Sequence, residues 1–357
     1  MSEEAKKLPA PRVSVIMPVY NMAGSLPDAI RSVREQTLRD IEIILVNDGS
    51  TDDSPVICAR AAAEDPRVKV ISGPNEGLSA ALNKGLDAAR GEWIGFCDAD
   101  DRARPELCQT LLDLAVRERA DLPSAALRMV SPDGETTGVT DFPIAGGAET
   151  IRGRENVLLR AFYPLLHRTG SVKGYRVICL FRRDLIEARH IRFCACMCED
   201  EMFMLDYLLS VKAIAVVRRD LYDYVRFRSS VCLNFFHKLD DFQRESSWCR
   251  QAHERERIFI ASDLAAGSPR TIHRLHLHTC YHEAQVVCCD PSLTRRERSA
   301  RLRDLRTSLR WGPRGPRGLA VGVFSACLQW TPSLLALLLW AKRCKDKLER
   351  RFGRAAR

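Results

Sequence analysis

The stretch that decides the fold reads Trp93-Ile94-Gly95-Phe96-Cys97 and continues directly as Asp98-Ala99-Asp100-Asp101. The apolar run predicts a short buried strand. Three carboxylates at the end of such a strand are costly to bury unless a positive group neutralises them. A divalent cation that carries phosphates does this, because Mg²⁺ or Mn²⁺ takes hard oxygen ligands and keeps positions open for substrate oxygens. Acidic turns are also typical of helix caps and solvated loops, so the rest of the chain has to decide.

Three further apolar segments precede this strand, with helical stretches between them. The segments are Val13–Val19, Ile41–Val46 and Val68–Ile71, and the helices are expected over 24–36, 54–63 and 78–89. This alternation predicts right-handed crossovers and a mostly parallel sheet. Ligands of such sheets bind beyond the carboxyl ends of the strands. We therefore expect Tyr20-Asn21, Asn47-Asp48 and the acidic turn 98–101 at one edge of the sheet.

Four motifs follow one another in the first hundred residues. They are Pro18-Val19-Tyr20-Asn21, residues 46–54 (VNDGSTDDS), residues 75–85 (NEGLSAALNKG) and the acidic turn 98–101. In this order and at this spacing they resemble the family 2 glycosyltransferases, and the resemblance covers about residues 12–230. It implies an α/β GT-A fold of nucleotide-diphosphate-sugar transferases, a mostly parallel sheet with helices on both faces. The sequence adds a helical C-terminal extension to this fold.

The chemistry of these residues agrees with a nucleotide site. Tyr20 offers a flat face for a base, and Asp48 can accept a ring N–H of uracil. The resemblance implies a nucleoside pocket lined by Pro18, Tyr20 and Asp48. It also implies that Asp98 reaches the ribose or the metal and that Asp100 binds Mg²⁺ or Mn²⁺ on the diphosphate. Taken singly, Tyr20 is equally compatible with a core aromatic and Asp48 with a turn residue.

The carboxylate expected to act as the general base lies about a hundred residues further on. Asp200 occurs in the run 198–203 (CEDEMF), which resembles the Glu-Asp segment that supplies the base in this family. An inverting transfer needs a base because the acceptor hydroxyl loses its proton while it attacks the anomeric carbon opposite the departing diphosphate. The alternative for Asp200 is a helix cap or first-turn acid. Asp101 is expected to cap the helix over 105–119 and not to bind metal.

Two positions depart from the family pattern, and a third region extends it. Leu82 stands where the family commonly has an arginine that supports the nucleotide or its phosphates. Residues 177–181 (VICLF) replace an aromatic-Asn-Lys-Leu-Tyr segment, so we expect an unusual acceptor pocket. The run 222–230 resembles the tail of the family's domain, where Arg226 or Arg228 would bind the diphosphate.

The net charge of +9 is spread unevenly, with an arginine-rich stretch between residues 295 and 317. No interleaved aromatics or nucleic-acid motif accompany it, so we expect no nucleic-acid partner. Residues 318–341 carry no charged side chain and precede a basic tail at 342–357, which predicts attachment to an anionic membrane surface. Pro332 favours a kinked or re-entrant segment over a clean crossing. The alternative is a buried pair of C-terminal helices.

We therefore expect five regions. They are a polar tail at 1–11, a GT-A domain over 12–235, a helical arginine-rich region at 236–317, the membrane-associating segment 318–341 and the basic tail 342–357; the domain divides into a nucleotide-binding half, 12–103, and an acceptor half, 104–235. The first tail lacks the apolar core of a secretory signal, so we expect the protein on the cytoplasmic side of the membrane with its cysteines reduced.

Two groups of soft ligands invite a metal interpretation, which their spacing disfavours. The Cys-x-Cys-x-Cys run at 194–198 lacks the two-to-four-residue spacer of a zinc site. His278 and His282 share a helix face, but the sequence implies no third ligand beside them.

These features predict an inverting glycosyltransferase. It would move a sugar from a nucleotide-diphosphate sugar, UDP-linked, to a glycan or lipid-linked acceptor in surface polysaccharide or glycoconjugate synthesis. The alternative is a catalytically silent nucleotide-sugar-binding scaffold, which Leu82 and the altered segment 177–181 favour. A nicotinamide-dependent dehydrogenase is disfavoured because no Gly-x-Gly-x-x-Gly follows the first strand.

Overall fold

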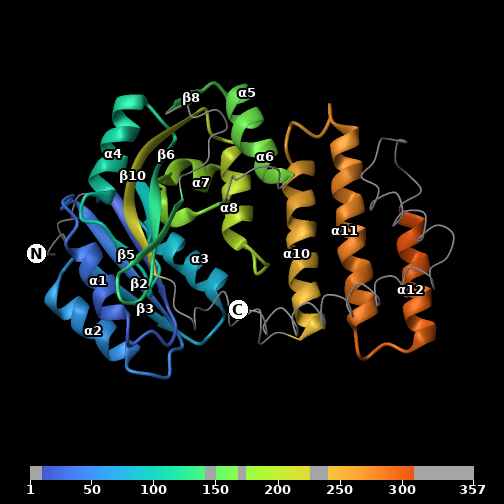
Figure 1. Cartoon of the computed structure of the whole chain (residues 1–357), viewed down its shortest axis with the longest axis horizontal. Helices are drawn as coiled ribbons and strands as arrows, with labels where there is room; N and C mark the ends of the chain where they lie inside the picture. Colours follow the sequence, from blue (N-terminus) through green and yellow to red (C-terminus); the bar gives the residue numbers. More distant parts are fainter. Residues whose placement is uncertain (1–9, 141–149, 168–173, 226–239, 309–357) are drawn as a thin grey trace, which may run out of the picture. The chain divides into compact units, whose positions relative to one another are not determined.

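The computed structural model describes residues 10–140, 150–167, 174–225 and 240–308 of the chain (Figure 1). The chain divides into two compact units, residues 1–230 and 231–357, and each is described by itself. The predicted membrane-associating segment 318–341 and basic tail 342–357 lie outside the described residues. Within the described ranges, no helix combines the length and the apolar character needed to cross a membrane.

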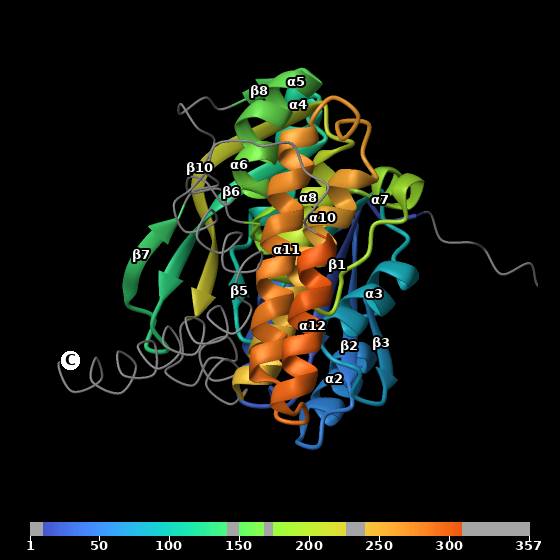
Figure 2. The same cartoon turned by 90° about the vertical axis from the view of Figure 1, so that its right-hand side faces the viewer.

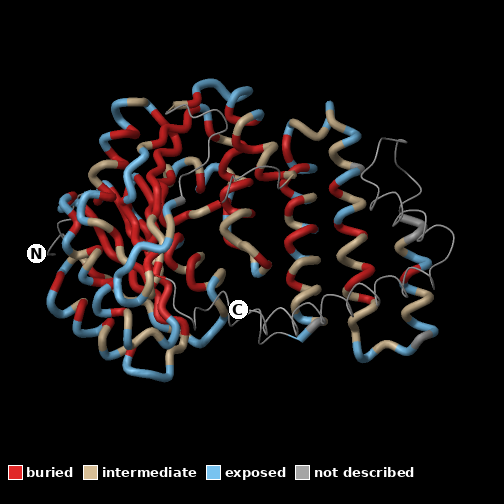
Figure 3. Tube along the Cα trace, in the orientation of Figure 1, coloured by how far each residue is buried: buried red, intermediate tan, exposed pale blue. Residues whose placement is uncertain are grey.

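Four parallel strands form the centre of the first unit. They are β1 (Val13–Val19), β2 (Ile41–Asp48), β3 (Val68–Gly73) and β4 (Trp93–Phe96), in the order β3-β2-β1-β4, with the short β9 (Phe181–Arg182) antiparallel beside β4. All seven residues of β1 and all eight of β2 are buried, as continuous apolar runs predict for a parallel sheet covered on both faces. Buried residues follow these strands in Figure 3. The predicted parallel sheet is confirmed.

Three helices connect these strands. They are α1 (Leu26–Arg34), α2 (Ser54–Glu64) and α3 (Leu78–Ala88), each within two residues of its predicted bounds. The apolar side chains of α1 recur at helical spacing and are buried, so this helix packs its apolar face inward. In Figure 1, α1 and α3 lie on opposite sides of strands β2 and β3, and Figure 2 shows the face of the sheet that α3 covers.

A second sheet in the same unit is mixed, unlike the mostly parallel arrangement of the first. Its strands are β5 (Arg102–Ala103), β10 (Ala213–Val225), β6 (Leu122–Val130) and β7 (Thr136–Thr140), in that order, and β8 (Thr150–Arg152) also pairs with β10. Strands β6 and β10 run parallel, and the other pairs of this sheet are antiparallel. A tight turn over 131–135 connects β6 to β7. Helix α4 (Leu107–Glu118) packs on this sheet through an apolar cluster that includes Leu114 and Ala215.

Short helices lie between β8 and β10 along the chain. They are α5 (Arg154–Val157), the π-turn η1 (Leu158–Phe162), α6 (Tyr163–Leu166), the 3₁₀ turn η2 (Arg176–Ile178), α7 (Arg183–Arg189) and α8 (Glu199–Leu208). An aromatic cluster anchors α8 to β4 and β9. Phe203 of α8 stacks on Phe193 with ring centroids 4.2 Å apart, and Phe96 of β4 meets the Phe193 ring edge-on at 5.5 Å. The first turn of α8 is therefore held close to the end of β4.

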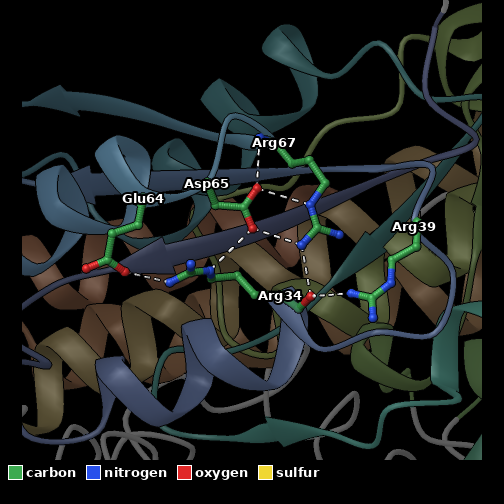
Figure 4. Close-up of polar contacts among 5 residues, drawn as sticks. All are labelled: Arg34, Arg39, Glu64, Asp65 and Arg67. Carbon is green, nitrogen blue, oxygen red and sulfur yellow. Dashed lines mark hydrogen bonds and ion pairs between the residues drawn. The ribbon is translucent and has the colours of Figure 1, made fainter.

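An ion-pair network fastens the far end of α1 (Figure 4). Asp65 accepts from Arg67 (Nη2 to Oδ2, 2.8 Å) and from Arg34 (Nε to Oδ2, 3.3 Å). Arg34 also reaches Glu64 at 2.9 Å, and the Arg34 carbonyl accepts from Arg67. The hydrogen bonds and charge of Arg67 lower the pKa of Asp65 to about 2 despite its burial. This network joins α1 to the turn between α2 and β3.

The described part of the second unit is helical. It contains α10 (Asp241–Ile260), α11 (Pro269–Cys289) and α12 (Arg295–Ser308). Asp240 and Gln243 close the start of α10 as a capping box. Between α10 and α11, histidines face glutamates in pairs, such as His253 with Glu283 at 2.9 Å. Among the described residues, neither His278 nor His282 belongs to a group of three metal-ligating side chains.

Candidate active site

Hydrogen bonds join the loops that follow β1, β2 and β4. The Asn21 side-chain oxygen accepts from the Thr51 N–H at 2.8 Å, and the Asn21 N–H donates to Ser50 Oγ at 3.0 Å. The Ser25 hydroxyl donates to the Ala99 carbonyl at 2.9 Å. The three polar turns therefore meet at one edge of the sheet, the edge beyond the carboxyl ends of its strands.

The first motif contributes one exposed and one buried residue to this edge. Tyr20 is 46% exposed, which removes the core-aromatic alternative and leaves its ring accessible for stacking. Pro18 is buried within β1 and lies opposite Val46 of β2. Tyr20 is thus the residue of this motif with a free aromatic surface.

Asp48 organises the turn that leads into α3. Its two carboxylate oxygens accept the backbone N–H groups of Glu76 and Gly77, at 2.9 and 2.8 Å. Gly49 follows in a left-handed conformation, with φ of +72°, and a Cβ there would lie 2.5 Å from the Asn75 nitrogen. Each oxygen of Asp48 keeps a second lone pair. The residue therefore has the structural role of a turn former and retains capacity for a further donor.

The prediction that Asp101 caps the following helix is wrong. Helix α4 begins at Leu107 and has Glu106 at its cap position. The buried Asp101 carboxyl instead accepts from the Tyr222 hydroxyl at 2.8 Å and from the Val225 N–H at 2.8 Å, both in β10. The polar groups of β10 therefore bind the Asp101 carboxyl, and this carboxyl does not cap α4.

Tyr222 supports the acidic turn from a fully buried position. Its hydroxyl donates to Asp101 and accepts from the backbone N–H of Asp98 at 3.0 Å. Burial, together with the charges of Asp98 and Asp100, raises the pKa of Asp101 well above its usual range. Tyr222 therefore holds the acidic turn at two points, Asp98 and Asp101.

Asp100, like Asp101, has no cationic partner in the described part of the chain. Among the described residues, no lysine, arginine or histidine lies within ion-pair distance of it. Burial and the neighbouring charge of Asp98 raise the pKa of Asp100 to about 6. The described residues hold no group of three metal-ligating side chains. A cation here would take one or two carboxylates and draw its other ligands from phosphates, as Mg²⁺ commonly does.

Arg176 is the residue that the sequence did not single out. Its side chain is 4% exposed, and Nη1 lies 2.6 Å from both carboxylate oxygens of Asp200. Its other terminal nitrogen, Nη2, forms an ion pair with Oδ1 of Asp98. The guanidinium also lies 5.8 Å from the ring centroid of Phe96. One buried cation therefore connects the end of β4 to the start of α8.

Asp200 is the second residue of α8, and the cap position belongs to Cys198, so Asp200 is not the helix cap. It does lie in the acidic first turn, as the other part of that alternative expected. Its side chain is 24% exposed. Burial raises the pKa of Asp200 to about 7, with the charges of Glu199 and Asp98 acting in the same direction and Arg176 opposing them. A carboxylate with a pKa near neutrality suits proton transfer.

Residues 14–181 match the model of glycosyl transferase family 2. They form a family 2 glycosyltransferase domain. EpsH of Bacillus subtilis (strain 168), whose name describes it as a glycosyltransferase, is 35% identical over 234 residues, which cover 64% of this chain and 65% of that protein. The succinoglycan biosynthesis protein ExoO of Rhizobium meliloti (strain 1021) is 32% identical over 57% of this chain and 56% of its own length. This chain thus spans less than two thirds of either relative.

Solved structures agree on the fold of the glycosyltransferase domain. S. aureus TarS 1-349, crystallised in complex with UDP-GlcNAc, superimposes with a TM-score of 0.63 over 94% of this chain and 92% of that one. The two chains share 16% sequence identity, so this likeness concerns the fold alone. The fold is of the GT-A type, as the four motifs predicted.

The departures from the family pattern lie in the interior of the domain. Leu82 is fully buried in α3, so no charge from this position reaches the sheet edge. All of 177–181 is buried, and Cys179 occupies the position of the family's lysine, where burial raises the thiol pKa to about 12. The two arginines predicted to bind diphosphate, Arg226 and Arg228, lie outside the described residues.

Two residues of the motif 75–85 have a role that sequence reasoning did not assign. Asn83 exchanges two hydrogen bonds with the backbone of Phe193, at 2.9 and 2.8 Å. Ser79 donates to the Cys194 carbonyl at 2.8 Å. Helix α3 therefore holds the segment that leads into α8. In that segment the thiols of Cys194 and Cys196 lie 2.7 Å apart.

Proposed function

We propose that this chain is an inverting glycosyltransferase that uses a UDP-linked sugar. The acceptor is a glycan or a lipid-linked saccharide in the synthesis of a surface polysaccharide or glycoconjugate. The names of the relatives support this class of product, because ExoO is named for succinoglycan biosynthesis. The UDP-GlcNAc complex of TarS supports the choice of nucleotide.

One observation carries the proposal. Asp98 and Asp200, which are about a hundred residues apart in sequence, are held on the same buried guanidinium. A donor-binding carboxylate and a proton-accepting carboxylate are what an inverting transfer needs at one place. Ion-paired carboxylates remote from the ends of parallel strands would not have this significance.

The residues divide the chemistry among them. Tyr20 stacks on the base, and Asp48 accepts from it while fixing the turn before α3. Asp98 contacts the ribose and the bound cation. Asp200 accepts the proton of the acceptor hydroxyl as that oxygen attacks the anomeric carbon, and the bond to the diphosphate breaks on the opposite face. The electron pair of that bond leaves with the nucleotide diphosphate.

Asp100, together with Asp98, is the group that fits Mg²⁺ or Mn²⁺. Its unpaired and partly desolvated carboxylate is a hard oxygen ligand in need of a positive charge. A cation bound there supplies charge neutralisation for the departing diphosphate.

Donor hydrolysis tests the proposal. The full chain is incubated with Mn²⁺ and, separately, UDP-glucose, UDP-galactose and UDP-N-acetylglucosamine, and free UDP is measured. We expect turnover of one donor, loss of turnover on adding EDTA, and a loss of about 10²-fold or more in Asp100→Ala and Asp200→Asn. Asp206→Asn, which alters a carboxylate of the same helix α8 paired with Arg189, is the matched control. Equal activity of Asp200→Asn and the native chain would refute the assignment of the base.

A catalytically silent nucleotide-sugar-binding scaffold is the second candidate. The buried Leu82 favours it, because the domain lacks the charge that this position carries in the family. The two candidates separate in one experiment: a scaffold is stabilised thermally by UDP-sugar and Mn²⁺ but releases no UDP with any donor or acceptor.

We further propose attachment to the cytoplasmic face of a membrane through residues 318–341 and the basic stretches around them. Their composition supports this, since apolar and basic segments act together on anionic lipid. Sedimentation with vesicles is the test. The full chain should pellet with phosphatidylglycerol-containing vesicles and a chain ending at residue 317 should not. Recovery of the full chain in the supernatant would contradict the proposal.

A further inference from the structure

Arg176 stands out among the charged residues of the domain because it has almost no contact with water and two carboxylate partners from different elements. One partner, Asp98, follows β4, and the other, Asp200, begins α8. Other arginine–carboxylate pairs in the first unit lie nearer the surface, such as Arg189 with Asp206, where the arginine is 31% exposed. A buried guanidinium is stable only where its partners are fixed.

An aromatic ring and the local backbone path hold Arg176 in place. Phe96 faces it from β4. Gly174, two residues earlier, approaches α8 so closely that a Cβ there would lie 2.9 Å from the Asp200 carbonyl oxygen. Arg176 itself begins the 3₁₀ turn η2. The backbone before Arg176 is therefore packed against the very turn of α8 that carries its partner.

The geometry of the contacts suits arginine specifically. Nη1 holds both oxygens of Asp200, while Nη2 holds a single oxygen of Asp98. Oδ2 of Asp98 takes no part in this ion pair and remains available to accept a hydrogen bond. The planar fork of arginine allows its two terminal nitrogens to serve two carboxylates at once, whereas the single ammonium of lysine reaches one.

We propose that Arg176 is the positioning residue of the general base: it fixes the Asp200 carboxylate relative to Asp98 and so aligns the base with the donor. The proposal rests on the proposed function, because Asp200 matters only if a proton is transferred. Arg176 itself neither takes up the proton nor contacts the sugar. Its effect is on the alignment of two groups that react only when correctly placed.

Two substitutions separate positioning from a purely structural role. Arg176→Gln removes the charge and the fork, and we expect kcat to fall about 10²-fold while the donor KM stays within about threefold. Arg176→Lys restores a charge that reaches one carboxylate, and it should recover about tenfold of this loss. If Arg176→Gln does not fold, Arg176→Lys decides alone, with kcat lowered at unchanged KM.

The matched control is Arg189→Gln, which removes an arginine–aspartate pair from the other end of α8. Its kcat should stay within about threefold of the native value. Binding of UDP with Mn²⁺, measured by calorimetry, should be preserved in all three variants, because neither Arg176 nor Arg189 is assigned to the nucleotide.

The outcomes distinguish this proposal from the proposed function. If Asp200→Asn is inactive but a folded Arg176→Gln keeps native kcat, the positioning role is refuted and the proposed function stands. If Arg176→Gln loses UDP binding as strongly as kcat, Arg176 belongs to the donor site and the proposal is also refuted. If the native chain hydrolyses no donor, both fail together. A selective loss of kcat with partial rescue by lysine supports the positioning role.

Discussion

Replacing Tyr222 with phenylalanine removes one oxygen atom, and two hydrogen bonds to the acidic turn are lost with it. The hydroxyl donates to Asp101 and accepts from the Asp98 N–H, at 2.8 and 3.0 Å. Tyr222 is fully buried, so water has little access to the groups left behind. The change therefore alters the support of the turn while the volume of the core is nearly kept.

The size of the effect follows from the two groups that lose their partners. Leaving a buried donor or acceptor unsatisfied costs about 1–3 kcal/mol each, so we expect the two groups to cost about 2–6 kcal/mol in total. For a unit of this size, each kcal/mol corresponds to about 2–4 °C in melting temperature. The Tyr222→Phe protein should therefore melt about 4–24 °C below the native chain.

Tyr207→Phe provides a matched control within the same unit. Tyr207 is also fully buried, and its hydroxyl accepts from the Arg182 N–H at 2.7 Å and donates to the Asp121 carbonyl at 2.8 Å. The two variants lose equivalent hydrogen bonds, so their melting temperatures in circular dichroism should fall by similar amounts. Tyr207 does not touch the acidic turn.

Binding of UDP with Mn²⁺ distinguishes the two variants. We expect Tyr222→Phe to weaken it by about tenfold or more, because Asp98 and Asp100 lose the anchor of their turn, and Tyr207→Phe to leave it nearly unchanged. Calorimetry below the lower melting temperature measures both. Equal affinities of the native chain and Tyr222→Phe, or equal weakening by both variants, would refute the role given to Tyr222.

Three further predictions concern other parts of the first unit. The lowered pKa of Asp65 contributes about 2 kcal/mol to the unfolding free energy above pH 5, and this contribution falls to about half at pH 3 because protonation breaks the ion pairs of Figure 4. The difference in unfolding free energy between the native chain and Asp65→Asn, measured in urea, should therefore become smaller between pH 5 and pH 3. A difference that stays constant would contradict this. Gly49→Ala should destabilise the unit by more than about 1 kcal/mol and weaken UDP binding, since the added methyl meets the backbone at a positive φ. Thermal melts and calorimetry measure the two effects, and native stability and affinity would contradict the role given to Gly49. Phenylarsine oxide should bridge Cys194 and Cys196, whose thiols are in contact. Peptide mass spectrometry should find the adduct on the peptide 193–212. An adduct that still forms in Cys196→Ser would refute the bridge between these two thiols.

The first sheet was predictable because its strands are buried on both faces. Such strands leave continuous apolar runs in the sequence, as in Val13–Val19, and no partner need be known to recognise them. Asp98 and Asp100 were predictable for a related reason, since acidic residues directly after such a run need a compensating charge. The structure places Asp98 beside the predicted base, since Arg176 pairs with both Asp98 and Asp200.

Pairings between distant segments were not predictable. Arg176 lies 78 residues from Asp98 and 24 from Asp200, and its local sequence carries no pattern that marks a buried cation. Asp101 was assigned to a neighbouring helix, while its partner Tyr222 lies 121 residues away. Local signals describe what a residue does with its neighbours in sequence, and burial of these polar groups depends on β10, whose position only the folded sheet determines.

The hydrogen bonds from Ser79 and Asn83 to the backbone of residues 193 and 194 have a consequence for swapping segments between relatives. In a chimera that receives the region 174–208 from another protein, the backbone of this region was shaped by contacts with the α3 of that other protein. Because side chains of α3 hydrogen-bond to main-chain atoms of this region, the imported segment will pack correctly only if the residues that correspond to 75–85 are taken from the same protein. In this chain, residues 75–85 and 174–208 therefore have to be exchanged together.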